Sequence, residues 1–276
     1  PLTGIWGESD VGGHWGIGLK GAGFDGVIVQ GASETPVYIY IDEDGAQILD
    51  ASDLWGKDTF ETDSLLKQKH GKNIVVQAIG QAGERLIPIA AIMTDGIDAR
   101  AAGRCGLGAV MGSKKLKALV VKGRKKAEIH DPDALRKEIT ELAKFQKANR
   151  GGMHEHGTAE GLLGNELSGD LPIRNWKWGA WDRKSEKLTG EVMTEKYLTG
   201  RFHCGNCVIG CGRTIKIKDS QYGPMEGAGP EYETIACLGS NILVEDLEAV
   251  CKANDLCNRY GLDTISIGGD IGFAML

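Results

Sequence analysis

The stretch Pro36–Asp42 (PVYIYID) decides the fold class of the first half of the chain, because β-branched and aromatic residues fill it between a proline and an aspartate. Similar short apolar runs at residues 27–29, 74–79, 86–93 and 118–121 predict further strands. Residues 59–69 predict a helix that ends before Gly71. The first half is therefore predicted to be rich in β-structure.

The character of the sequence changes near residues 123–129. Asp131 and Pro132 supply an N-cap and a proline at the first helical position, and apolar residues then recur with a helical period to about Asn149. We therefore predict an α+β fold, with a β-rich domain over 1–126 and a largely helical domain over 127–276.

Composition excludes several classes of protein. The chain has 276 residues, long enough for two units, and its net charge of −6 disfavours a nucleic-acid binder. No apolar run reaches membrane-spanning length, and seven unevenly spaced cysteines indicate thiols kept reduced, so a soluble cytoplasmic protein is expected. One basic run is expected to be a solvated face: Lys114, Lys115, Lys117, Lys122, Arg124, Lys125 and Lys126.

Two glycine-rich segments can bring backbone N–H groups close to a ligand, as phosphate or pterin cradles require. The first surrounds Ser9 and Asp10, and the second covers residues 99–113. Plain glycine-rich turns between strands are the alternative. The second segment lacks the G-K-[ST] ending of a nucleotide-binding P-loop, and its Cys105 is interpreted as a small buried residue.

A third segment, Phe202–Arg213 (FHCGNCVIGCGR), holds three cysteines spaced C-x2-C-x3-C. Thiolates that close together can bind one soft metal centre, and glycines allow the loop to turn tightly. An iron–sulfur cluster is the preferred interpretation; zinc would equally need a fourth ligand, and three ordinary core cysteines are the alternative.

Carboxylates and histidines give weaker signals. Glu231 and Glu233 lie where a proline-marked turn enters an apolar helix, so they can satisfy free N–H groups there or move protons beside a redox centre. Gly261 is a natural helix stop and Asp263 a natural N-cap. His154 and His156 are interpreted as surface polar residues.

Taken together, these segments resemble the aldehyde ferredoxin oxidoreductase family, the tungsten-pterin enzymes of anaerobes. The resemblance follows the family's order along the chain through PLTGIWGESDVGGHWG, LKGAGFDGVIVQG, PVYIYI, AAGRCGLGAVMGSKKLKA, the cysteine loop, GPEYET and NRYGLDTIS. It implies a first domain built on two β-sheets that carries the pterins, followed by largely helical structure.

The resemblance also implies the cofactors: tungsten, or less often molybdenum, held by two pterins that are bridged through phosphates and magnesium, with a 4Fe-4S cluster close by. Cys204, Cys207 and Cys211 match three cluster ligands. The fourth cysteine and a proton-transfer histidine are expected beyond Leu276, because the chain is interpreted as a fragment that lacks both ends of the family's sequence. The fragment is expected to be inactive alone.

The pterin-binding residues are carried over by position. Asp10 and Gly12 match a family Asn-x-Gly, so an acid replaces an amide, and the backbone of Ala101 and Ala102 matches the second loop. A family D-x-x-G-L-D motif becomes Asn258, Gly261, Leu262 and Asp263 within NRYGLD.

The implied reaction oxidises an aldehyde to a carboxylic acid and passes the electrons to ferredoxin. Glu233, with Glu231 as the alternate, matches the carboxylate beside the tungsten. The alternatives are the tungsten subunit of an aromatic acyl-CoA reductase, disfavoured by the intact GPEYET, and a simple electron-transfer or zinc-binding module. A homo-oligomer is allowed, and neither nucleic acid nor membrane is an expected partner.

Overall fold

The computed structural model describes residues 4–276, which fold as two compact units. Unit 1 contains residues up to Ala127 together with Leu256–Asp263, and unit 2 contains Glu128–Asp255 and Thr264–Leu276. The mixture of helices and strands confirms the expected α+β fold. None of the helices within residues 4–276 combines the length and the apolar composition that a membrane span requires.

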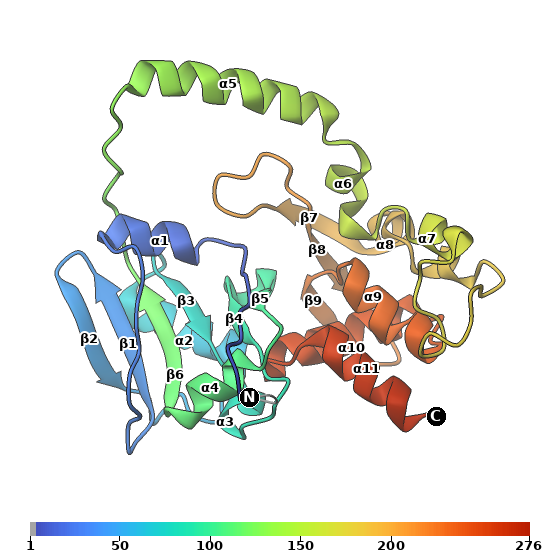
Figure 1. Cartoon of the computed structure of the whole chain (residues 1–276), viewed down its shortest axis with the longest axis horizontal. Helices are drawn as coiled ribbons and strands as arrows, with labels where there is room; N and C mark the ends of the chain where they lie inside the picture. Colours follow the sequence, from blue (N-terminus) through green and yellow to red (C-terminus); the bar gives the residue numbers. More distant parts are fainter. Residues whose placement is uncertain (1–3) are drawn as a thin grey trace. The chain divides into compact units, whose positions relative to one another are not determined.

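Unit 1 is built on one six-stranded sheet, with the strand order β2-β1-β6-β3-β4-β5 (Figure 1). β1 and β6 are parallel and the other neighbouring strands are antiparallel. The resemblance implied two sheets, whereas the described strands of unit 1 form this single one. Its elements are α1 (Trp15–Ala22), β1 (Val37–Asp42), β2 (Gly45–Asp50), α2 (Thr59–His70), β3 (Val75–Ala78), α3 (Gln81–Glu84), β4 (Ile92–Thr94), η1 (Gly96–Asp98), β5 (Arg100–Ala102), α4 (Leu107–Ser113) and β6 (Leu116–Val121).

Side chains alternate between the two faces of this sheet, as the two-residue repeat of a strand requires. Tyr38 and Tyr40 of β1 join Leu66 of α2 in a core on one face. Ile41, one residue further along β1, joins Leu19 of α1 in a core on the other face. The predicted strand at residues 27–29 is wrong, since these residues form no strand, although Val27 and Val29 pack against the sheet.

Local sequence fixes the start of α2. Asp58 accepts a hydrogen bond from the Glu61 N–H (2.7 Å), and Glu61 accepts one from the Asp58 N–H (3.1 Å). This capping box satisfies two N–H groups that a helix start leaves without partners. Glycine ends the same helix, because Gly71 has φ of +92° and donates to the Lys67 carbonyl.

The basic run that follows α4 is not wholly solvated. Lys117 in β6 is fully buried and pairs with Glu84, a carboxylate in α3. Lys117 Nζ also donates to the Lys57 carbonyl (2.8 Å), so it ties the loop before α2 to the sheet. The expectation of a solvated face is therefore wrong at this position.

Unit 2 combines helices with a three-stranded antiparallel sheet, β7-β8-β9. α5 begins as predicted, with Asp131 accepting from the Ala134 N–H (3.0 Å) and Pro132 in the first turn. The last turn of α10 belongs to unit 1. The elements are α5 (Pro132–Asn149), α6 (Gly151–His156), η2 (Gly157–Ala159), α7 (Leu162–Ser168), η3 (Lys184–Leu188), α8 (Gly190–Tyr197), β7 (Leu198–Phe202), β8 (Gly212–Ile217), β9 (Met225–Ala228), α9 (Tyr232–Leu238), η4 (Ser240–Ile242), α10 (Leu247–Tyr260) and α11 (Thr264–Ala274).

Candidate functional site

The first glycine-rich segment runs along the loop between β5 and α4 in unit 1. A Cβ added to Gly7 would lie 3.2 Å from the Cβ of Cys105, so the two segments touch where glycine has no side chain. Two residues later, Ser9 Oγ accepts a hydrogen bond from the Arg104 N–H (3.3 Å). Asp10 and Gly12 follow in an irregular, exposed stretch.

The Asp95 carboxylate binds the end of the first glycine-rich segment at His14. Its carboxylate accepts from the His14 N–H (3.4 Å) and lies 3.1 Å from His14 Nδ1. A Cβ on Gly13 would lie 2.2 Å from Asp95 Oδ2, and Gly13 has φ of +88°, so glycine is required there for both reasons. Gly7 and Gly13, on either side of Asp10, therefore allow this segment to lie close to Cys105 and Asp95.

The second glycine-rich segment starts at the edge of the sheet. Ala101 and Ala102 lie in β5, where they pair with Met93 and Ile92 of β4; Ala101 is exposed and Ala102 buried. Cys105 and Gly106 then have φ of +67° and +68°, which turns the chain into α4. Cys105 is exposed, so its interpretation as a small buried residue is wrong.

The third segment, Asn258–Asp263, returns to unit 1 from the end of α10. The buried Asn258 carbonyl accepts from Thr59 Oγ1 (2.7 Å), and Gly261, with φ of +70°, turns the chain after the helix. The Gly261 carbonyl then accepts from the Ala91 N–H (2.8 Å), and Leu262 forms an isolated bridge with Ala90. Backbone contacts thus dock this segment beside β4.

Arg104 and Asp263 join the second and third segments. Arg104 Nε lies 3.3 Å from Asp263 Oδ2, with the carboxylate only 5% exposed and the arginine 58% exposed. Since Ser9 binds the backbone of the same arginine, all three segments that the resemblance assigned to pterin meet around residue 104. Local sequence gives no signal for the parts played by Arg104, Asp95 and His14.

These residues fit a phosphate-bearing pterin in their chemistry. An exposed loop with few side chains presents backbone groups, and an exposed guanidinium supplies positive charge for an anionic group. One acid nearby, Asp98, has a shifted pKa. Burial, with Asp95 as a further cause, raises the pKa of Asp98, so this carboxyl takes a proton more readily than an exposed aspartate.

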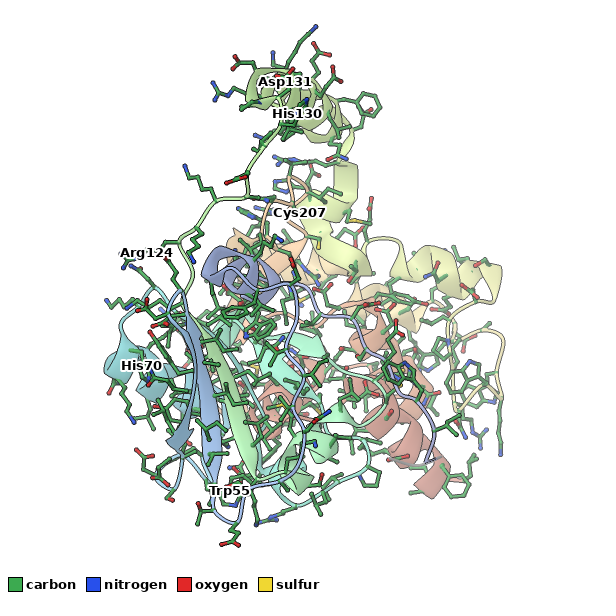
Figure 2. All side chains as sticks on the ribbon, turned by 60° about the vertical axis from the view of Figure 1, so that its left-hand side comes forward. Trp55, His70, Arg124, His130, Asp131 and Cys207 are labelled. Atoms are coloured by element: carbon green, nitrogen blue, oxygen red, sulfur yellow. The ribbon has the colours of Figure 1, made fainter. Side chains whose placement is uncertain are left out.

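The cysteine segment connects β7 and β8 in unit 2. Cys204, Cys207 and Cys211 all lie outside any disulfide. Cys207, labelled in Figure 2, is exposed, and the other two are half-buried. The Cys207 N–H donates to the Cys204 carbonyl (2.8 Å), and Gly205 and Gly210 have positive φ, so the loop turns tightly as expected.

The loop fits a soft metal centre in donor chemistry, because three accessible thiols lie on one short connection. Within residues 4–276, however, no group of three or more His, Cys, Asp or Glu side chains is arranged to hold a metal ion. The structure therefore brings the three cysteines into one loop without directing their side chains to a common point, and the cluster stays a prediction.

Other cysteines are poor ligands by comparison. Burial raises the pKa of Cys251 to about 12, and burial with the Asp263 charge raises the pKa of Cys257 to about 12. Metal ligation needs the thiolate, which such burial opposes. Cys251 and Cys257 are therefore less suited to a metal than the thiols of the loop.

The two candidate catalytic carboxylates have different surroundings in unit 2. Glu231 accepts a short hydrogen bond from Thr158 Oγ1 and lies 3.7 Å from Arg213 Nη2. Thr158 Oγ1 also accepts from the Tyr232 N–H (3.0 Å), which fixes the start of α9. Glu233, in the first turn of that helix, is exposed.

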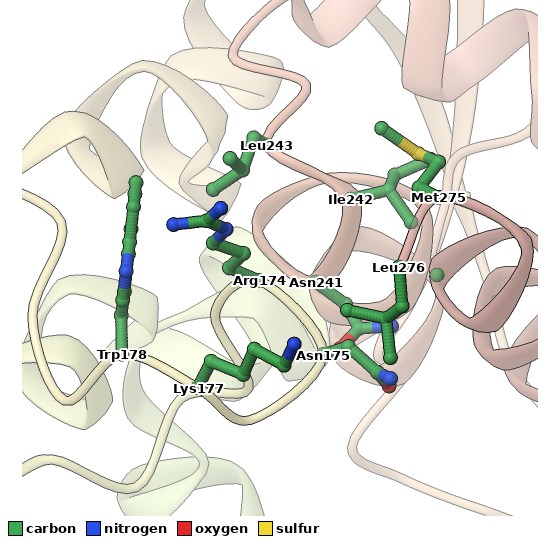
Figure 3. Close-up of a pocket in the computed structure, with 10 residues that line it drawn as sticks. Arg174, Asn175, Lys177, Trp178, Asn241, Ile242, Leu243, Met275 and Leu276 are labelled. Carbon is green, nitrogen blue, oxygen red and sulfur yellow. The ribbon is translucent and has the colours of Figure 1, made fainter.

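Unit 2 also has a cavity of about 440 Å³ near the end of α11 (Figure 3). The Arg174 guanidinium lies 4.8 Å from the ring centre of Trp178 at its wall. Its lining residues are Arg174, Asn175, Lys177, Trp178, Asn241, Ile242, Leu243, Gly272, Met275 and Leu276. None of the residues assigned from sequence lines it.

Two family models together cover nearly the whole chain. Residues 1–123 match the N-terminal domain of aldehyde ferredoxin oxidoreductase, and residues 134–276 match domains 2 and 3 of the same enzyme. The chain belongs to the aldehyde ferredoxin oxidoreductase family. The resemblance drawn from the sequence motifs is confirmed.

Curated members of the aldehyde ferredoxin oxidoreductase family are similar over the full chain. The tungsten-containing aldehyde ferredoxin oxidoreductase of Thermococcus kodakarensis is 45% identical over 100% of this chain, and that of Pyrococcus furiosus is 41% identical over 100%. The chain spans 45% of the length of both relatives.

Other relatives carry different activities. An aliphatic sulfonate oxidoreductase subunit of Pyrococcus furiosus is 33% identical over 94% of this chain and 43% of its own length. Among solved structures, the active site complex of benzoyl coenzyme A reductase superposes with a TM-score of 0.79 and 28% identity, over 97% of this chain and 42% of that one. Proteins named for other reactions therefore share sequence and fold with this chain.

Proposed function

We propose that this chain is part of a tungsten-pterin enzyme that oxidises aldehydes to carboxylic acids and passes the electrons to ferredoxin. Relatives at 41–45% identity are named as tungsten-containing aldehyde ferredoxin oxidoreductases. The main structural support comes from Arg104. Its backbone N–H donates to Ser9, and its guanidinium pairs with Asp263. That junction joins all three segments that the proposal assigns to the pterin.

Each segment has a proposed part in holding the pterin cofactor. The backbone around Asp10, Gly12, Ala101 and Ala102 would bind its phosphates and the bridging magnesium, since these residues lie in or beside exposed irregular chain. The segment that holds Asn258, Gly261, Leu262 and Asp263 would bind the pterin ring, with the Asp263 carboxylate, paired with Arg104, as a hydrogen-bond acceptor. The residues thus bind and orient the cofactor.

When bound, the tungsten-pterin would supply two-electron redox chemistry and a 4Fe-4S cluster would supply one-electron transfer. Cys204, Cys207 and Cys211 would hold the cluster as thiolates. Glu233 would accept the substrate proton, because its carboxylate is exposed, whereas Glu231 is held by Thr158 and Arg213. The reduced state of the thiols fits the cytoplasm.

The test uses the native full-length protein, purified without oxygen. We expect tungsten and iron in the purified protein and reduction of a viologen dye that depends on acetaldehyde. Zinc without tungsten would contradict the proposal and favour a simple metal-binding module.

A second candidate is the tungsten subunit of an aromatic acyl-CoA reductase. The structural similarity to benzoyl coenzyme A reductase supports it. The intact GPEYET turn speaks against it, because the resemblance places a cysteine ligand to the metal there in the reductases. Tungsten with no aldehyde activity, but with electron transfer to an aromatic CoA thioester, would favour this candidate.

A further inference from the structure

We propose that His154 is a positioning residue that fixes the backbone of the cysteine loop and so supports the binding of its cluster. The inference rests on the proposed function, in which Cys204, Cys207 and Cys211 hold that cluster. His154 lies in α6, outside the segments that the resemblance assigns to a cofactor. Its interpretation as a surface polar residue is incomplete, because its ring binds the loop.

The contact is a short hydrogen bond between the side chain and the loop backbone. His154 Nδ1 lies 2.6 Å from the carbonyl oxygen of Ile209, midway between Cys207 and Cys211. A carbonyl only accepts, so Nδ1 carries the hydrogen and donates it. The half-buried imidazole also covers the next residue, since a Cβ on Gly210 would lie 3.6 Å from Nδ1.

Two arginines that flank the loop fix α6 in place. Arg201 of β7 donates to the His154 carbonyl (3.0 Å) and the Glu155 carbonyl (3.1 Å). Arg213 of β8 donates to the next carbonyl, that of His156 (2.8 Å). Three consecutive carbonyls at the end of α6 are therefore bound by the two strands that begin and end the loop.

These contacts hold α6 in place, and α6 in turn supports the loop. Carbonyls at a helix end need partners, and the flanking arginines supply them with positive charge at the negative end of the helix. The helix in turn returns one hydrogen bond, through His154, to the centre of the loop. The segment between Cys207 and Cys211 is thus bound by a helix that is itself hydrogen-bonded to both flanking strands, and such support helps a ligand loop to keep metal-binding geometry.

The neighbouring histidine provides a matched control. His156 lies in the same helix, but its Nδ1 is 3.4 Å from Thr194 Oγ1 in α8. Replacement of His156 therefore removes a histidine from α6 without removing the hydrogen bond to Ile209. Asparagine at position 154 keeps an N–H near the place of Nδ1.

The experiment compares His154→Ala, His154→Asn and His156→Ala in the native full-length protein. The measurements are the rate of iron loss to a chelator and the EPR signal of the reduced cluster. We expect His154→Ala to lose iron roughly 10-fold faster than wild type, at the lower end of the loss of metal affinity that follows removal of a contact behind a ligand. His154→Asn should recover most of the difference, and His156→Ala should match wild type.

Each contrary outcome has a distinct meaning. A wild-type protein without a cluster overturns both the proposed function and the inference. A wild-type protein with a cluster, and equal iron loss in His154→Ala and His156→Ala, overturns the inference alone. Equal acceleration in His154→Ala and His154→Asn overturns the role of the hydrogen bond. Circular dichroism checks that each variant is folded.

Discussion

Arg213 Nη2 lies 3.7 Å from Glu231 Oε2, and the arginine that makes this contact is completely buried. The same Nη2 donates to the Pro230 carbonyl, at 2.7 Å. Because Arg213 follows Cys211 by two residues, the strand that leaves the cysteine loop also holds the turn that carries the candidate catalytic carboxylates. Glu231 therefore has a structural part, which separates it from the exposed Glu233.

Replacement of the two glutamates should have different effects. We expect Glu233→Gln to lower aldehyde turnover by roughly 100-fold, the lower end of the contribution of a general acid or base. Its tungsten content and thermal unfolding should not change, because the side chain is exposed in the first turn of α9. Viologen reduction and metal analysis of the variant measure both.

Glu231→Gln is the matched variant. It weakens the contacts with Thr158 and Arg213, so we expect a loss of about 1 kcal/mol in the free energy of unfolding, a small value because Glu231 is 30% exposed. Loss of tungsten in Glu233→Gln, or full activity in that variant, would show that Glu233 is not the proton acceptor.

Arg104→Ala should weaken cofactor binding without much effect on stability. The pair with Asp263 is too exposed on the arginine side to contribute more than about 1 kcal/mol to folding. Loss of the guanidinium removes the positive charge offered to the anionic group of the cofactor and the partner that orients Asp263, so we expect roughly 10-fold weaker retention of the pterin. Pterin and tungsten per protein after exhaustive dialysis give the result.

Lys20→Ala is a suitable control in the same unit. Lys20 pairs with Asp25, and both side chains are exposed, 59% and 85%. This variant loses a comparable surface cation away from Ser9 and Asp263. Equal cofactor retention in the two variants would argue against a specific part for Arg104.

Strong local patterns predicted much of the fold. The apolar runs of β1 and β3, rich in β-branched and aromatic residues, and the helices α2 and α5 lie where the sequence placed them, within one or two residues. The run 86–93 failed as a strand, since only its last two residues enter β4 and Leu86 has φ of +58°. Local propensity cannot show which apolar runs find a neighbouring strand.

Contacts distant in sequence were beyond local inference. The basic run that contains Lys117 has the composition of a solvated face. Burial of this lysine depends instead on its pairing with Glu84, 33 residues away in the sequence. Likewise, Ser9 and Arg104 meet across 95 residues. The motifs located the candidate cofactor segments, but Arg104 and His154 became visible only through the packing.

Histidine protonation should reduce the stability of unit 1 at acid pH. His70, at the end of α2 (Figure 2), stacks on Tyr40 with 4.5 Å between ring centres, and its Nε2 lies 2.9 Å from the Tyr38 hydroxyl. Burial, then the charges of Lys69 and Lys122, lower the pKa of His70 from its ordinary value of 6.5. The folded state therefore favours the neutral ring.

The sign of the effect follows from this shift. A histidine with a lowered pKa contributes stability above pH 6.5, and that contribution is lost as the pH falls through the folded-state pKa. His70→Gln cannot titrate, so urea midpoints at pH 7.5 and 5.5 should differ less for the variant than for wild type. An equal difference in both proteins would rule out His70 as a source of acid sensitivity.

Lys117 and Glu84 form a buried ion pair, so replacing only one of the two residues should destabilise the protein. Burial lowers the pKa of Lys117, but Glu84 opposes this shift, and the Glu84 carboxylate also accepts from the Gly56 N–H (2.9 Å). We expect Lys117→Met to cost about 3–5 kcal/mol in the free energy of unfolding, because it leaves a buried carboxylate without its cation.

Adding Glu84→Gln to Lys117→Met should recover part of that loss. A glutamine carries no charge, and its carbonyl oxygen can still accept from Gly56, so the penalty for an uncompensated buried charge disappears. Urea unfolding of the wild type, both single variants and the double variant completes a double-mutant cycle. If the double variant were less stable than Lys117→Met alone, the cost of the single replacement would have to come from lost packing of the lysine stem and from the Lys57 carbonyl that it leaves without its donor.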